Sequence, residues 1–119
     1  MRVIKSFACA FDGLKDCLLH EKNFKIQTVL ASLVIIAGLF FSITAMEWII
    51  ILICIAAVLS LEIINSAIEK LCDLVCPDFN LTIKKVKDMS ASAVLLSAII
   101  SFIIGSIIFF PKIFEMFSR

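Results

Sequence analysis

Hydrophobic residues occur along this chain in three long runs separated by short polar segments. Residues 28–46 and 89–110 contain no charged side chain, and each run approaches or exceeds the roughly 20 residues that cross a bilayer as a helix. The run at residues 48–61 is shorter, and it becomes a full span only if the helix continues through Glu62. The pattern predicts an all-α integral membrane protein with three transmembrane helices, at residues 27–46, 48–74 and 88–110.

The first 25 residues follow a different pattern. Apolar residues recur at alternating spacings of three and four, which makes one stripe on a helix: Ile4, Phe7, Phe11, Leu14 and Leu18. Next to a membrane span, such an amphipathic helix lies in the plane of the interface. We expect an interfacial helix over residues 1–25 and a single membrane domain over residues 1–119. A cleaved signal peptide is not expected, because the first long apolar run starts only near residue 28.

Short connections join the predicted spans. We expect the first turn around residues 44–48, and the second connection carries the turn residues Pro77, Asp78 and Asn80. Asp88 is a candidate N-terminal cap for the third helix, and Pro111 is expected to end that helix. Small residues at every fourth position of the third span predict a close helix packing face: Ala93, Ser97, Ser101 and Gly105.

The composition supports a membrane protein and orients it. The chain is 62% hydrophobic and 18% charged, well below the roughly 25% charged residues of a soluble domain. Basic residues precede the first predicted span and lie between the second and third, but none lies between the first and second. Because basic loops favour the cytoplasmic side, we expect a multi-pass protein of the inner (cytoplasmic) membrane with its N-terminus and second connection in the cytoplasm. No basic surface interleaved with aromatic residues suggests nucleic acid.

The second predicted span carries a polar stripe. At 3.6 residues per turn, five polar residues return to one face of an otherwise apolar helix: Glu62, Asn65, Ser66, Glu69 and Asp73. We expect Glu62 to lie a turn or two beneath the cytoplasmic surface and Glu69 to lie near the boundary with water. A charged carboxylate in the bilayer costs roughly 2.5–3.5 kcal/mol on insertion scales, so such residues usually serve a function.

Two carboxylates at different depths can divide the work of a phosphoryl transfer. The shallower one can hold Mg²⁺, which takes one or two carboxylates plus phosphate oxygens, and the deeper one can accept a proton from a lipid hydroxyl. Glu21 is a candidate second metal ligand, and Lys84, Lys85 and Lys87 can balance phosphate charge. These parts indicate phosphoryl transfer to a membrane-embedded alcohol.

Two other functional classes fit the same stripe. A small proton- or cation-coupled transporter would use the buried glutamates as a relay, and a structural subunit of a membrane assembly would use them only to hold helices together. The chain has three glycines and no Gly-rich phosphate loop, which excludes the soluble kinase classes that depend on one.

The stripe also carries a family resemblance. The segment EIINSAIEKLCD, residues 62–73, resembles the signature E-x-x-N-[ST]-[AS]-I-E-x-x-x-D of the small prokaryotic diacylglycerol kinases, a family that includes the undecaprenol kinases. The resemblance extends to EKNFK near the N-terminus and to KDMSASAV in the third span, while EWIIIL and FFPK are more similar to the undecaprenol kinase branch. It implies a lipid kinase that uses ATP and Mg²⁺ to make undecaprenyl phosphate or phosphatidic acid.

Carried over position by position, the resemblance implies specific roles. Glu62 would be the general base, supported by Asn65, and Glu69 and Glu21 would hold the Mg²⁺ that accompanies ATP. Nucleotide contacts are implied for Arg2, Lys87 and Asp88 and, with weaker matches, for Asp78 and Asn80. The family forms homotrimers with active sites shared between subunits, which would explain how Glu21 meets the stripe. Ala91 stands where the diacylglycerol branch has a serine.

Overall fold

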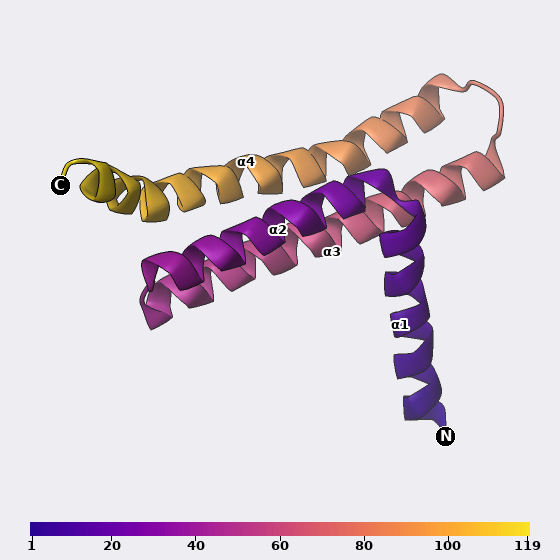
Figure 1. Cartoon of the computed structure of the whole chain (residues 1–119). Coiled ribbons are helices and arrows are strands. Elements are labelled where there is room, and N and C mark those ends of the chain that lie inside the picture. The colour runs from indigo at the N-terminus through magenta and orange to yellow at the C-terminus, as the bar shows by residue number, and fades with distance from the viewer.

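The computed structural model describes all 119 residues, and every element in it is a helix. Helix α1 (Arg2–His20) is followed by α2 (Lys22–Phe41), α3 (Ala45–Val75) and α4 (Leu81–Phe117). The last three helices are long and apolar enough to cross a membrane. They run alongside one another, whereas α1 runs crosswise to them and leads away from the bundle (Figure 1). The structure confirms the predicted all-α membrane fold with three spanning helices and a separate N-terminal helix.

Helix α3 is the centre of the bundle. It packs against α4, against α2 and against the end of α1, whereas the backbones of α2 and α4 stay apart and these helices meet through side chains such as Phe41 and Phe109. A small apolar core of Ile43, Ile51 and Ile108 joins the α2–α3 turn to α4. Only 12 of the 119 residues are buried, so most of the apolar surface of one chain is left for lipid or for other protein to cover.

The N-terminal helix is shorter than the predicted 1–25. It ends at His20, and Glu21 adopts an extended conformation with φ −101° and ψ 109°. The Glu21 N–H donates to the carbonyl of Cys17 and the Glu21 carbonyl accepts from the N–H of Lys25, so this single residue closes one helix and opens the next. Because the apolar stripe of α1 ends at Leu18, the chain turns here from the interface toward the membrane, and residues 22–25 belong to the first spanning helix.

The first turn lies earlier than the predicted residues 44–48. Ser42 takes a left-handed conformation with φ 50°, and Thr44 caps α3 with its side chain. Glu47 completes a capping box: its N–H donates to Thr44 Oγ1 at 3.2 Å, and its carboxylate accepts from the Thr44 N–H at 3.0 Å. The same carboxylate pairs with Lys112 Nζ at 3.1 Å, which links the start of α3 to the last turns of α4.

Two predictions for the third spanning helix were wrong. Asp88 is not its N-cap, because α4 starts at Leu81 and Asn80 Oδ1 accepts from the N–H groups of Thr82 and Ile83 at 2.9 and 3.1 Å. Pro111 does not end the helix either, since α4 continues to Phe117. A proline removes one main-chain donor and has a φ that suits a helix, and spanning helices tolerate that loss.

The close helix contact lies on α2 and not on the ridge of small residues in α4. A Cβ added at Gly38 would lie 2.7 and 2.9 Å from two ring atoms of Trp48, whereas a Cβ added at Gly105 would meet nothing within 4 Å. Gly38 therefore allows the indole of α3 to lie against the backbone of α2. The packing predicted at Gly105 is not made inside one chain.

Replacing Gly38→Ala is expected to lower the melting temperature in detergent by several degrees, because overpacking typically costs about 1–3 kcal/mol. Fluorescence of Trp48, the single tryptophan, reports both unfolding and the local change. The matched variant Gly105→Ala should melt with the parent protein. An unchanged melting temperature for Gly38→Ala would contradict the contact.

Candidate functional site

The polar stripe of α3 becomes more exposed along its length. Glu62, Asn65 and Ser66 are buried, with exposed fractions of 3%, 5% and 5%, while Glu69 is half-buried and Asp73 is exposed. The stripe therefore connects a protein-covered carboxylate deep in the bundle with a carboxylate at the open end of α3.

Asn65 lies between the two glutamates of the stripe. Its Nδ2 donates to Glu69 Oε1 at 3.3 Å, but its Oδ1 is buried without a hydrogen-bond partner. Leaving a buried acceptor unpaired costs about 1–3 kcal/mol, so this oxygen marks a position where a donor from a ligand would be stabilised. Glu62 and Glu69 are seven residues apart, so two turns of α3 bring both carboxylates to the same face.

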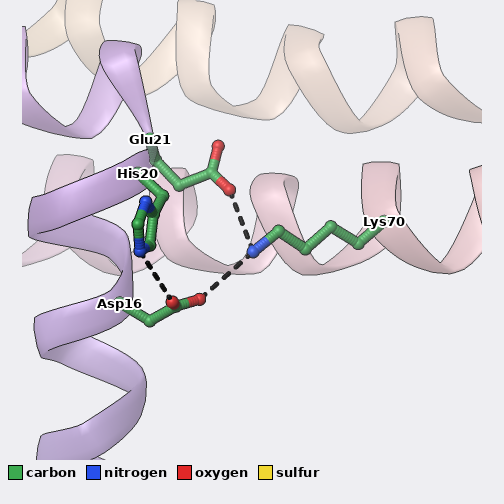
Figure 2. A network of polar contacts seen from close by, with 4 residues as sticks. All are labelled: Asp16, His20, Glu21 and Lys70. Atoms are coloured by element: carbon green, nitrogen blue, oxygen red, sulfur yellow. Dashed lines mark hydrogen bonds and ion pairs between the residues drawn. The ribbon is translucent and has the colours of Figure 1, made fainter.

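Glu21 reaches this site from the corner between α1 and α2. Lys70 Nζ of α3 lies 3.1 Å from Glu21 Oε1 and 3.3 Å from Asp16 Oδ2, and Asp16 also faces His20 Nε2 at 3.7 Å (Figure 2). Glu21 therefore contacts α3 inside one chain, through Lys70, the residue that directly follows Glu69 of the stripe.

The α3–α4 turn supplies the other end of the site. Lys87 of α4 pairs with Asp73 at the end of the stripe, and Asp88 pairs with Lys84 at 2.7 Å on the exposed side of α4. Asp78 and Asn80 lie in the turn itself, where the Asn80 side-chain oxygen is used to cap α4. The structure thus brings Lys87 to the stripe, whereas Asp88, the next residue of α4, is exposed and pairs with Lys84.

Arg2 is the predicted site residue that one chain does not bring to the others. It is the first residue of α1, and α1 extends away from the bundle with the N-terminus at its far end (Figure 1). Nineteen residues of helix place Arg2 roughly 28 Å along the axis from Glu21.

Lys70 is a residue of this polar cluster that the sequence did not single out. In the sequence it counts only as one of the basic residues that orient the second connection. Its partner Asp16 lies 54 residues away, and no local pattern connects the two. The available signal was its position directly after Glu69 in the polar segment.

A groove in the bundle leads along α3 toward Glu62. It has a volume of about 680 Å³ and is lined mainly by hydrophobic side chains of α2, α3 and α4. Its α3 floor includes Ile51, Ile55, Val58 and Leu59, and the helical period puts Glu62 on that same face one turn further. Ser101 and Gly105 of the small-residue ridge line the α4 side.

The donor set fits a cation that arrives with phosphate. No group of three or more His, Cys, Asp or Glu side chains is arranged to hold a metal by itself. Mg²⁺ needs only one or two carboxylates when phosphate oxygens and water complete its shell. Glu21 and Glu69 each have one carboxylate oxygen engaged with Lys70 or Asn65, which leaves the other oxygen of each able to bind a cation.

Comparison with known proteins gives one consistent result. Residues 8–109 match the family model described as prokaryotic diacylglycerol kinase. The chain is 38% identical to the undecaprenol kinase of Bacillus subtilis (strain 168) over 112 residues, which cover 94% of this chain and 91% of that protein. It is 36% identical to a diacylglycerol kinase of Helicobacter pylori (strain J99) over 99 residues, 82% and 77% of the two chains. The identity to the diacylglycerol kinase of Escherichia coli (strain K12) is 26% over 102 residues, 86% and 84% of the two chains.

Proposed function

The chain belongs to the prokaryotic diacylglycerol kinase family and is a multi-pass membrane lipid kinase with ATP as its phosphoryl donor, and we propose that the polar stripe of α3 is its active site. The alternative of a proton- or cation-coupled transporter receives no support from these relatives.

One observation carries the assignment of the reacting groups. Buried Glu62 and the unpaired Asn65 Oδ1 lie together on the α3 face that the apolar groove shares. A lipid hydroxyl that enters from the groove donates to Glu62, which takes the proton as the oxygen attacks the γ-phosphorus. The bond between that phosphorus and the bridging oxygen of ADP breaks, and the acid form of Glu62 can then donate to Asn65 Oδ1.

Glu69 and Glu21 hold Mg²⁺, which when bound neutralises phosphate charge that develops during the transfer. Lys87 contacts the phosphates from the α4 side, and Asp88 contacts the adenosine side. Asp78 and Asn80 line the connection next to the nucleotide. The exposed end of the stripe, where Asp73 and Lys87 meet, supports a nucleotide that approaches from water.

The active enzyme is a homotrimer in which Arg2 serves the site of a neighbouring subunit. Two features support this assembly: Arg2 lies roughly 28 Å along α1 from the Glu21 of its own chain, and few residues are buried in the single chain. A second subunit next to α1 can place a basic side chain at the nucleotide without bending that helix.

The enzyme lies in the inner (cytoplasmic) membrane with its N-terminus and the α3–α4 connection in the cytoplasm. The basic residues of α1 and of the α3–α4 connection support this orientation. It puts the α1–α2 corner and the α3–α4 turn on the side where ATP is available.

The acceptor is a polyprenol of the undecaprenol type. The 38% identity to an undecaprenol kinase, over nearly all of both chains, supports this choice. The groove holds the hydrocarbon chain of the acceptor, because its α3 floor continues into the face of Glu62. The lipid then lies along the bundle with its hydroxyl next to the general base, Glu62.

Replacing Glu62→Gln is expected to reduce phosphoryl transfer by at least 10²-fold, the lower range for loss of a general base, while MgATP still binds. Glu69→Gln is expected to weaken MgATP binding, because it removes a metal ligand. Transfer of radiolabel from ATP to lipid and equilibrium nucleotide binding, both in detergent, measure these effects. Retention of most activity by either variant would refute its assigned role.

Filling the groove with Gly105→Leu is expected to raise KM for the lipid about tenfold, which corresponds to about 1.4 kcal/mol, without changing MgATP affinity. Ala93→Leu adds the same side chain to the same ridge but outside the groove, so it should leave KM unchanged. Parallel kinetics with undecaprenol and diacylglycerol should give the higher kcat/KM for undecaprenol. An unchanged lipid KM in Gly105→Leu would rule out the groove as the chain site.

A membrane-impermeant maleimide should label Cys9 in inverted membrane vesicles but not in intact cells. Cys9 is exposed, and at about 100° per residue it lies opposite the apolar stripe of α1. Cys17 should react slowly in both preparations, since burial raises the pKa of its thiol, Glu21 and Asp16 raise that pKa further, and Lys70 only partly offsets them. Labelling of Cys9 in intact cells would contradict the proposed orientation. The variant Cys9→Ser is the control, because it should lose the labelling that is due to Cys9.

A further inference from the structure

We propose that Lys70 is a phosphate-binding residue of the ATP site, which it reaches beside Glu21 as Lys87 reaches it beside Asp73. This inference rests on the proposed function and adds a residue to it. Lys70 belongs to α3, but its side chain extends to the α1–α2 corner, where it meets Glu21 (Figure 2).

The negative charge of the site favours lysines close to the carboxylates. Glu62, Glu69 and Asp73 follow one another along α3, and Glu21 is tied to the same part of that helix by Lys70, so these carboxylates repel a polyphosphate unless positive charges lie beside it. Two lysines pair with these carboxylates: Lys87 with Asp73 from α4, and Lys70 with Glu21 from the α1 side. Beside the Mg²⁺ that Glu21 and Glu69 would hold, Lys70 is the lysine whose ammonium pairs with Glu21.

The hydrogen-bonding capacity of Lys70 fits this role. An ammonium group has three donors, and the contacts to Asp16 and Glu21 account for two of them. The side chain of Lys70 is 58% exposed, while that of Glu21 is 20% exposed. The ammonium is therefore open to water on the side that Glu21 does not cover, and its third donor is available for a phosphate oxygen.

Lys70 can move from its resting contacts at little cost. Its pair with Asp16 joins two largely exposed side chains, and such pairs contribute little to stability. A lysine is a compact charge on a flexible stem and binds phosphate as a point charge. A phosphate held to Glu21 through a shared cation would lie next to this ammonium, which can keep its contact with Glu21.

The competing explanation is that Lys70 only ties α1 to α3 and so keeps Glu21 in place. The two roles differ in what they predict for the nucleotide series. A phosphate contact affects ATP more than ADP, and ADP more than AMP, whereas a lost tether weakens all three nucleotides to a similar extent. They also differ at Asp16, which belongs to the tether but has no contact with phosphate in the proposed site.

The test measures equilibrium binding of ATP, ADP and AMP to the full-length protein in detergent, with Mg²⁺ present. Lys70→Met should weaken ATP binding about tenfold or more, the size expected for one charge-assisted contact, and should leave AMP binding within about twofold. Lys70→Arg should restore ATP affinity to within about threefold, because the charge is kept. Asp16→Asn should bind ATP like the parent chain.

Lys15→Met is the matched control, since Lys15 is an exposed lysine of α1 without an ion pair; it should bind all three nucleotides like the parent. Trp48 fluorescence confirms that each variant is folded. Parental ATP affinity in Lys70→Met, an equal loss for AMP, or the same loss in Asp16→Asn would each overturn the proposal. If Glu69→Gln and Glu62→Gln behave as predicted, such a result rejects only the role proposed for Lys70. If those two variants keep parental activity and MgATP binding, the proposed active site itself is rejected.

Discussion

A carboxylate inside a spanning helix constrains the whole bundle, because an ionised side chain in hydrocarbon is expensive and must face protein or a polar site. Glu62 is 3% exposed, and the helix that carries it is the one that packs against all three others. The same face of α3 holds the groove floor before Glu62 and the polar residues after it. The orientation of α3 that keeps Glu62 away from lipid therefore also puts the apolar groove and the polar stripe on the same face of the helix.

The corner at Glu21 is the second requirement for a site that serves both water and membrane. One extended residue lets α1 follow the interface while α2 enters the membrane. The side chain at that corner contacts Lys70 of α3, so the interfacial helix brings a carboxylate to the residue that follows Glu69. In the proposed reaction, the lipid hydroxyl reaches Glu62 from the groove while the nucleotide approaches from the side of Glu21 and Lys87.

The parts of the fold that depend on short-range periodicity could be predicted. Three apolar runs located the three spanning helices, and spacings of three and four located α1 and the polar stripe. The helix ends were predicted less well. Hydropathy marks where a helix is apolar but not where its caps lie, and the caps at Thr44 and Asn80 start α3 and α4 before the charged or aromatic residues that seemed to mark their beginnings. Pro111 does not stop α4, because a spanning helix tolerates the loss of one main-chain hydrogen bond.

The sequence by itself determined that this is a three-span membrane protein with acidic residues on one face of its second span, because helical periodicity depends only on neighbouring positions. Its family resemblance named the same stripe as the active site. The tertiary structure decided that Lys70 of α3 joins Asp16 and Glu21 within one chain, and that the groove lies over the α3 residues one turn before Glu62. These features depend on contacts between residues as far apart as 54 positions, and their geometry exists only once α1 has turned at Glu21 and the three long helices have packed.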